Sequence, residues 1–206
     1  MTTFLLIRHG YSKSNENGRF TGQTDVPLAE LGFTQAEQTA RYLAAHYNID
    51  FIYSSPLQRA YHTALPISKY LNLPIQIEDD VKEINGGEWE KKTPEEILRL
   101  YKDEYTLWLN DIGMARCTGG ETMQEVQIRA IQALENIAKR HDGKVVAVIT
   151  HAGVIRTLQC LWQNLPLSEM KTIAWVDNTS ISTAIYENGL FSLREIGSIL
   201  HLTKTK

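Results

Sequence analysis

The sequence has few cysteines and no long apolar segment. Its 206 residues include two cysteines, Cys117 and Cys160, outside any paired Cys/His spacing, which argues against a disulfide framework and against a zinc site. The first apolar run, Phe4 to Ile7, is shorter than a signal-peptide core, has no basic residue before it and ends at Arg8. No run approaches the length of a membrane span. We therefore expect a cytoplasmic protein with no membrane partner.

The chain also has no large excess of positive or negative charge. The chain carries 21 Lys and Arg against 24 Asp and Glu, a formal net charge of -3, and no block of like charges suggests a nucleic-acid partner. There is no internal repeat and no low-complexity segment. With 43% hydrophobic residues, the chain is long enough to bury one substantial core, and we expect a single domain over residues 1–206. Nothing in this pattern specifies an oligomeric state.

Short apolar runs mark the expected strands. The early runs are apolar on successive residues rather than alternating, which is typical of strands covered by helices on both faces. Asn188-Gly189 separates the last two runs and predicts a hairpin turn, because both turn positions need a positive φ. The expected strands are residues 3–7, 51–55, 74–77, 144–150, 180–187 and 190–196.

Helix-start signals stand between these runs. Thr34, with Glu37 three residues later, forms a capping-box pattern and predicts a helix that begins after Thr34. Ser55-Pro56 opens a second helical segment, which should kink or split at Pro66. Further start signals are Thr93-Pro94 with Glu96 and Thr122 with Glu125. Strands and helices alternate, which predicts an α/β layered sandwich with a largely parallel central sheet flanked by helices on both faces.

Basic side chains follow the carboxyl ends of three expected strands. They are Arg8 and His9 after the first run, Arg59 in the first turn of the helix after "FIYSS", and His151 after "VVAVIT". Ligands of open α/β sheets bind beyond these ends, and the free N–H groups of a helix start favour an anion. Singly, each residue is more often hydrogen-bonded or solvated. Together they describe a phosphate pocket, because guanidinium groups bind phosphate oxygens bidentately and histidine can act as a nucleophile.

Six blocks of sequence stand in a recognisable order. The first is Arg8-His9-Gly10, followed by Ser12 and Asn15. The others are "NENGRFTGQTDVPLAELG", "SSPLQRAYHTA", "EINGGEWE", "GGETMQEV" and "VITHAGVIR". In composition and order these blocks resemble the histidine phosphatase superfamily, which includes the cofactor-dependent phosphoglycerate mutases. The resemblance runs from residue 4 to residue 182, nearly the whole chain.

The resemblance implies a reaction and a role for each site residue. His9 would take the phosphoryl group as a phosphohistidine, which water then cleaves. Arg8, Arg59 and His151 would stabilise charge on the phosphoryl oxygens, so no metal and no cofactor are implied. The positive charges of the two arginines, and that of His151 where this ring is charged, should also keep the His9 ring neutral. Glu83 would protonate the leaving alkoxide and later activate water.

Substrate contacts follow from the same resemblance. Asn15, Thr21 and Gly22 fall where the family places phosphate and substrate contacts, whereas a plain loop turn is the other interpretation of "FTG". Without the resemblance, Glu83 is most simply an exposed glutamate after "DDVK". Aromatic side chains mostly fill cores. We therefore give the pocket role little weight for Trp89, Trp108, Trp162 and Trp175.

The segment after Glu83 separates two activities within the family. The mutases, as the resemblance implies, carry there an arginine, histidine, tyrosine and glycine run and a longer insertion with extra basic residues. In this chain, residues 84–113 form a shorter segment, in which the acidic residues at least match the basic ones in number and no two arginines are adjacent. Without clustered cations a bisphosphorylated intermediate is poorly held, and water should reach the phosphohistidine. We therefore predict a phosphatase of small phosphomonoesters, with candidates from sugar phosphates through phosphoglycerates to nucleotide-type monoesters.

Two alternatives remain open. A cofactor-dependent phosphoglycerate mutase is the nearer one, with Lys91, Lys92 or Arg116 as the missing cations. A catalytically silent binding module is the other, since a fold does not establish activity. A silent relative would be free to lose any residue of the site, and this chain keeps Arg8, His9, Arg59, Glu83 and His151.

Overall fold

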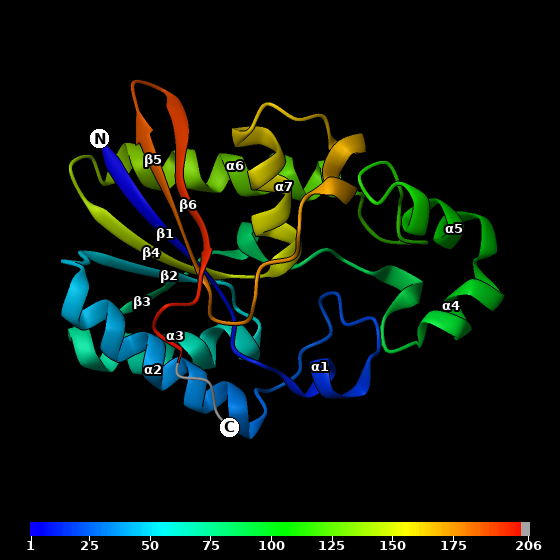
Figure 1. Cartoon of the computed structure of the whole chain (residues 1–206), viewed down its shortest axis with the longest axis horizontal. Helices are drawn as coiled ribbons and strands as arrows, with labels where there is room; N and C mark the ends of the chain where they lie inside the picture. Colours follow the sequence, from blue (N-terminus) through cyan, green and yellow to red (C-terminus); the bar gives the residue numbers. More distant parts are fainter. Residues whose placement is uncertain (203–206) are drawn as a thin grey trace.

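The computed structural model describes residues 1–202, which fold around a central sheet of six strands (Figure 1). The strands are β1 (Thr2–Arg8), β2 (Phe51–Ser54), β3 (Ile75–Ile77), β4 (Val145–Thr150), β5 (Ile181–Glu187) and β6 (Leu190–Ser198). Their order across the sheet is β3-β2-β4-β1-β5-β6. β3, β2, β4 and β1 run parallel, and β5 is antiparallel to both its neighbours. The predicted α/β class with a largely parallel sheet is confirmed.

Helices cover both faces of this sheet. The α-helices are α1 (Lys13–Asn17), α2 (Glu30–His46), α3 (Gln58–Leu71), α4 (Pro94–Leu100), α5 (Lys102–Asn110), α6 (Met123–Arg140) and α7 (Ala152–Trp162). Three short 3-10 helices are η1 (Asp79–Val81), η2 (Gly87–Trp89) and η3 (Leu167–Thr172). α2 and α3 lie on one face, α6 and α7 on the other, and α4 and α5 project beyond one end of the sheet (Figure 1). Within residues 1–202, no helix is long and apolar enough to cross a membrane.

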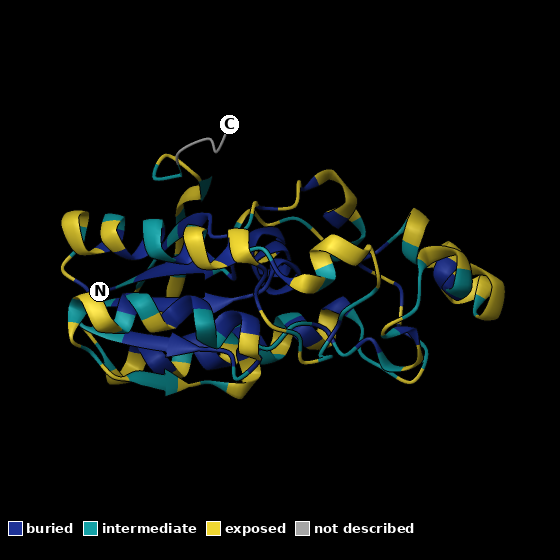
Figure 2. Ribbon diagram, turned by 90° about the horizontal axis from the view of Figure 1, so that it is seen from below, coloured by how far each residue is buried: buried dark blue, intermediate teal, exposed yellow. Residues whose placement is uncertain are grey.

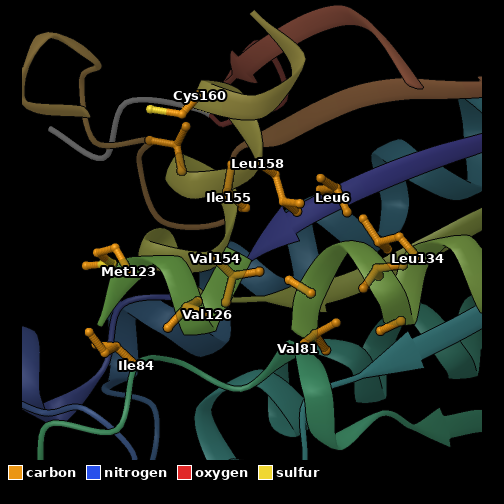
Figure 3. Packing of buried hydrophobic residues seen from close by; sticks show 14 of the residues in the cluster. Leu6, Val81, Ile84, Met123, Val126, Leu134, Val154, Ile155, Leu158 and Cys160 are labelled. Carbon is orange, nitrogen blue, oxygen red and sulfur yellow. The ribbon is translucent and has the colours of Figure 1, made fainter. Parts of the chain in front are cut away.

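The sheet buries apolar side chains on both faces. Along β1, Leu5 and Ile7 belong to the cluster formed with α2 and α3, while Phe4 and Leu6 belong to the cluster formed with α6 and α7. Figure 3 shows the second cluster, where Leu6 meets side chains of α6 and α7. Figure 2 shows dark-blue strands in the interior and exposed outer faces of the helices; the buried strands are β1, β2 and β4, whereas the edge strands β3 and β6 are partly exposed. This two-sided burial explains why the early runs are apolar on successive residues.

Several local expectations hold. Asn188 and Gly189 have φ of 52° and 84° and join β5 to β6, as the hairpin signal predicts. The capping boxes at the starts of α4 and α6 are formed by the residues that the pattern indicates. In both, a threonine side chain accepts from the backbone N–H of the glutamate three residues on. Local hydrogen bonding decides these positions.

α2 begins earlier than the capping-box pattern predicts. It starts at Glu30 with Ala29 as N-cap, and Thr34 lies inside it, where its Oγ1 donates to Glu30 O at 3.3 Å. Ala29 N–H donates to Tyr11 O at 2.9 Å, and a Cβ on Gly32 would lie 2.1 Å from the same oxygen. The predicted start after Thr34 is wrong, because packing against Tyr11 rather than a cap fixes the first turn.

α3 runs unbroken through Pro66. The helix begins at Gln58, after Ser55-Pro56, and continues for 14 residues. Pro66 removes one intrahelical hydrogen bond, but Ala64 and Ile67 on either side of it are fully buried against the rest of the fold. Of the two predicted effects of Pro66, a kink or a split, the split is wrong, since tertiary packing outweighs the loss of one bond.

Candidate active site

The carboxyl ends of β1, β4 and β2 meet at one edge of the sheet. Arg8 pairs with Thr150 across β1 and β4, so His9 and His151 each follow directly after a paired position. The centroids of the two imidazole rings are 5.2 Å apart. The register of the parallel sheet, and not any local sequence signal, therefore brings two histidines that are 142 positions apart into contact.

Two arginines flank the histidines. Arg59, 1% exposed in the first turn of α3, donates from Nη1 to Thr24 O at 2.9 Å and from Nη2 to Gly22 O at 2.7 Å. Arg8 donates from Nη1 to Val176 O at 2.6 Å. The Nε of Arg8 is buried and has no hydrogen-bond partner among residues 1–202. Burial lowers the pKa of both guanidinium groups, which stay charged near neutral pH because arginine starts so high.

His9 is held as a neutral ring. It is 5% exposed, and its Nδ1 lies 2.8 Å from Gly10 O. A carbonyl oxygen only accepts, so Nδ1 carries the proton and Nε2 keeps its lone pair. Burial first, and then the charges of Arg59 and Arg8, hold the pKa of His9 well below its usual value. The ring therefore has the protonation state that nucleophilic attack requires.

His151 is also neutral in the free protein. It is fully buried, its Nε2 lies 2.8 Å from Ser55 Oγ, and its Nδ1 has no partner within the described chain. Burial is the main reason why the pKa of His151 is held well below its usual value, followed by the positive charge of Arg59. The sequence leaves the charge of His151 open, and burial decides for the neutral ring because it penalises the imidazolium form.

Glu83 reaches the strand tips from a segment without regular structure, between η1 and η2. Its Oε2 accepts from Gly153 N–H, in the first turn of α7, at 3.2 Å. A Cβ on residue 153 would lie 2.3 Å from Glu83 Oε1, so only glycine leaves room for the carboxylate. Burial lowers the pKa of Arg8 and Arg59, and the Glu83 carboxylate opposes that shift in both. Glu83 therefore belongs to the same electrostatic site.

A cleft of about 330 Å³ collects the residues expected from the sequence. Its lining includes Arg8, His9, Asn15, Thr21, Gly22, Arg59 and Glu83. His151 does not line the cleft and contacts it through the His9 ring. Asn15 is partly engaged, since its Oδ1 accepts from the Ser12 N–H at 2.9 Å. Over residues 1–202, no group of three His, Cys, Asp or Glu side chains could hold a metal ion.

The sequence does not predict most of the residues that line the outer part of the cleft. Trp175 is 49% exposed and lies over the Arg156 guanidinium, 4.2 Å from ring centroid to carbon, and Trp108 packs edge-on against Phe20. Both tryptophans line the cleft, whereas Trp89 is fully buried. The only available signal for Trp175 is its place in a stretch without helical or strand periodicity. The other missed lining residues are Ser14, Arg19, Phe20, Ile84, Met123 and Ala152.

Several known proteins are similar to this chain in sequence and in fold. The family model of the histidine phosphatase superfamily (branch 1) matches residues 4–198. Phosphoserine phosphatase 1 of Hydrogenobacter thermophilus is 33% identical, over 98% of this chain and 95% of its own. The metal-independent phosphoserine phosphatase of Arabidopsis thaliana is 36% identical, over 77% of this chain and 67% of its own. The solved structure of Bacillus stearothermophilus YhfR has a TM-score of 0.93 at 30% identity, covering 98% of this chain and 99% of that one.

Proposed function

The chain belongs to the histidine phosphatase superfamily, and on that basis we propose that it hydrolyses small phosphomonoesters through a phosphohistidine at Nε2 of His9. The predicted enzyme class, a metal-independent phosphatase of small phosphorylated metabolites, is confirmed by relatives that carry phosphatase names, one of them named as metal-independent. The roles of the individual residues and the choice of substrate are our proposal.

The observation that carries the proposal is the state of His9. Its Nδ1–H is held by Gly10 O, its Nε2 is unprotonated, and it lies in the cleft with Arg8 and Arg59. In the first step the Nε2 lone pair bonds to phosphorus while the bond from phosphorus to the leaving oxygen breaks. In the second step water attacks phosphorus, and the imidazole leaves with its lone pair. Buried cations stabilise the charge that phosphoryl transfer spreads over the oxygens.

Two buried polar atoms supply further contacts to the phosphoryl group. Arg8 Nε and His151 Nδ1 have no hydrogen-bond partner in the described residues. An unsatisfied buried donor costs about 1–3 kcal/mol, so such atoms in a native protein need an explanation. We assign Arg8 Nε, which belongs to a residue that lines the cleft, as a donor to a phosphoryl oxygen. His151 lies behind His9 in the free protein, and we propose that its Nδ1 donates to the phosphoryl group once that group is bonded to the His9 ring. The neutral His151 ring then donates through Nδ1 and accepts from Ser55 Oγ at Nε2.

Glu83 acts as the general acid and base in this scheme. As the bond to the leaving oxygen breaks, its carboxyl proton moves to that oxygen, and in the second step the carboxylate takes a proton from the attacking water. The contact with Gly153 N–H fixes one carboxylate oxygen beside the strand tips. Among the donors of residues 1–202, the other oxygen accepts only from the N–H of the next residue, Ile84, at 3.0 Å.

The mutase alternative lacks support in the placement of the cations. None of Lys91, Lys92 and Arg116 lines the cleft. Lys92 Nζ donates to Glu88 O, and Arg116 donates to Gly120 O at 2.7 Å and pairs with a glutamate at 2.8 Å. A second phosphate would therefore find few cations. Exchange of label between mono- and bisphosphoglycerate tests the mutase, and an exchange rate that matches phosphate release would overturn our choice.

The substrate proposal rests on Arg19, the one lining cation away from the strand tips. Arg19 is exposed, donates from Nη1 to Lys91 O at 2.7 Å and pairs with Glu96 at 3.4 Å. A surface ion pair contributes about 0–1 kcal/mol, so this guanidinium can exchange Glu96 for an anion of the substrate. We propose phosphomonoesters of small alcohols that carry a carboxylate, as phosphoserine does.

A phosphate-release panel tests both the activity and the substrate class. We expect O-phosphoserine and 3-phosphoglycerate to turn over with lower KM than β-glycerol phosphate, which has no carboxylate. Arg19→Met should raise the KM for O-phosphoserine about tenfold and leave that for β-glycerol phosphate unchanged. Activity should survive EDTA. Equal effects of Arg19→Met on both substrates would contradict the carboxylate contact, and loss of activity in EDTA that a divalent ion restores would contradict the mechanism.

We also propose that residues 1–206 act as one catalytic domain in the cytoplasm. Cys117 and Cys160 are free and buried, and burial raises the pKa of the Cys117 thiol to about 12. Both thiols therefore behave as core residues that need no oxidising compartment. Limited proteolysis should release no smaller active fragment, and cell fractionation should place the activity with cytoplasmic markers. An active fragment, or activity in a secreted fraction, would contradict the respective statement.

A further inference from the structure

One arginine holds the backbone on the amino-terminal side of Glu83. Arg129, on α6, donates from Nη1 to Asp80 O at 2.7 Å and to Lys82 O at 2.6 Å, and from Nη2 to Glu83 O at 3.0 Å. Its Nε and Nη2 also donate to the Glu121 carboxylate at 2.9 Å and 3.0 Å. These bonds occupy all five N–H groups of a guanidinium. Arg129 therefore has no donor left for a substrate.

Glu121 holds the backbone on the carboxyl-terminal side of Glu83 by hydrogen bonds. Its Oε2 accepts from Asn85 N–H at 2.7 Å, and its own N–H donates to Asn85 O at 2.9 Å. The side chains of Glu121 and Arg129 are 22% and 15% exposed, so their bidentate ion pair is largely shielded from water and strong. Arg129 and Glu121, called the clamp below, thus fix the chain on both sides of Glu83.

The segment around Glu83 needs such a clamp because it lies in no helix or strand and so lacks regular backbone hydrogen bonds. Buried carbonyls require donors, and side chains supply them to the carbonyls of residues 80–83: Arg129 serves three of these, and Thr150 Oγ1 donates to Val81 O at 2.7 Å. The side chains of Val81 and Ile84 are buried beside α6, as Figure 3 shows, whereas Glu83 lines the cleft. Small rotations of this backbone would swing the carboxylate away from the strand tips.

We propose that Arg129 and Glu121 are positioning residues for the phosphatase reaction, which fix the backbone so that the Glu83 carboxyl meets the leaving oxygen. The inference rests on the proposed acid role of Glu83. In that role the carboxyl proton passes to the leaving oxygen as its bond to phosphorus breaks. The clamp does not contact His9, so in the first step it should affect only substrates whose leaving group needs a proton.

The test compares two leaving groups in the Arg129→Lys variant. Lysine keeps the charge but cannot form the five-donor fork. A displacement of about 1 Å can cost about 100-fold in rate, so single turnover of O-phosphoserine should slow by about that factor. With p-nitrophenyl phosphate, whose leaving group needs little acid help, the nitrophenol burst should stay within about threefold of wild type. Equal slowing of both first steps would overturn the positioning role.

A double-mutant cycle separates positioning from general damage. In a Glu83→Gln background, Arg129→Lys should slow O-phosphoserine turnover by less than about twofold, because the group that it positions is already inactive. Full additivity would overturn the inference. If Glu83→Gln alone slows both substrates equally, the acid role of Glu83 is wrong, and that outcome removes the proposed mechanism independently of the Arg129 data.

Two further variants control for folding. Arg116→Lys changes an exposed arginine outside the cleft that also pairs with a glutamate, and both first steps should keep wild-type rates. Glu121→Gln keeps the shape of the clamp and removes its charge. It should give the leaving-group selectivity of Arg129→Lys in weaker form, and it carries the test if Arg129→Lys does not fold. Wild-type selectivity in a folded Glu121→Gln protein would overturn the role of the ion pair.

Discussion

His9 and His151 follow the tips of two hydrogen-bonded strands, whereas Glu83 lies in a segment with no strand or helix of its own. The cleft therefore has two walls of different construction. The strand-tip wall consists of Arg8, His9, Arg59 and, behind them, His151. The other wall, called the loop wall, combines loop residues with Ser14 and Asn15 of α1 and Trp108 of α5. Its loop residues are Arg19, Phe20, Thr21, Gly22, Glu83, Ile84 and Trp175.

The two walls also differ in burial. His9 and Arg59 are 5% and 1% exposed, whereas Trp175 is 49% exposed. Buried charges act strongly and need no rearrangement during the reaction, and the sheet fixes their backbone. Loop residues tolerate change. We infer that the phosphoryl chemistry resides in the strand-tip wall, and that proton transfer to the leaving group and the choice of substrate reside in the loop wall.

His9→Ala should break the strand-tip wall and produce the largest effect. Loss of the nucleophile should lower kcat by at least about 10,000-fold and abolish the acid-labile phosphoryl label on the protein, because no other side chain is placed to replace the ring. Rapid-quench labelling with a 32P substrate measures both. His46→Ala, which removes an exposed histidine of α2 that is outside the cleft, is the control. Label that persists in His9→Ala would assign the nucleophile elsewhere.

Glu83→Gln should break only the loop-wall part of the chemistry. Glutamine keeps the size of the side chain but donates no transferable proton, so alkyl phosphates should slow by about 100-fold to 10,000-fold. With p-nitrophenyl phosphate, the first transfer should persist as a nitrophenol burst near one equivalent per site. A slow steady state should follow, because the phosphohistidine then lacks its base. Equal slowing of alkyl and aryl substrates without a burst would make Glu83 a structural residue.

The strand-tip wall could be predicted largely from the sequence. The runs before Arg8-His9 and before His151 are apolar on successive residues, and such strands lie parallel in the middle of a sheet with their carboxyl ends together. The neutral state of His9 was expected from the charge of its neighbours, but burial is the larger cause. Burial also makes His151 neutral instead of charged. The extent of burial depends on the whole fold, which no local pattern contains.

In the loop wall, the family resemblance predicts Glu83, Asn15, Thr21 and Gly22, and no sequence signal predicts the other lining residues. Glu83 has no periodicity that marks it, and its placement depends on Gly153 and Arg129, which lie 70 and 46 positions further along the chain. The same limit explains the wrong start of α2, where Tyr11 sets the first turn from another part of the chain. Contacts between distant segments leave no local signature.

The pH dependence of stability tests whether the strand-tip wall is buried as described. Burial holds the pKa of His9 and of His151 well below 6.5, so below pH 6.5 the unfolded chain binds protons that the folded chain does not. Stability should therefore be complete above about pH 6.5 and fall toward the lower, folded pKa by about 1.4 kcal/mol per pH unit for each ring. Urea unfolding between about pH 7.5 and pH 5 measures the slope.

His151→Asn is the variant that sharpens this measurement. With one buried ring removed, the slope below pH 6.5 should be shallower than in the wild type, whereas His46→Asn, on the exposed face of α2, should leave it unchanged. Identical slopes in the wild type and His151→Asn would mean that the His151 ring is charged in the folded protein. The electrostatic description of the strand-tip wall would then be wrong.

Trp175→Ala should give the smallest effect on activity. It tests whether the loop that carries Trp175 affects substrate binding alone or also the chemistry of the strand-tip wall. The indole is held over Arg156, whose Nε donates to Ile173 O at 2.7 Å, so it offers a fixed aromatic face to an aryl leaving group. Its loss should raise the KM for p-nitrophenyl phosphate by about fivefold and leave kcat unchanged, while Trp175→Phe should keep most of the affinity. The neighbouring Val176 O holds Arg8 at 2.6 Å. A fall in kcat without a change in KM would therefore show that this loop also positions the strand-tip wall, and the division between the two walls would fail there.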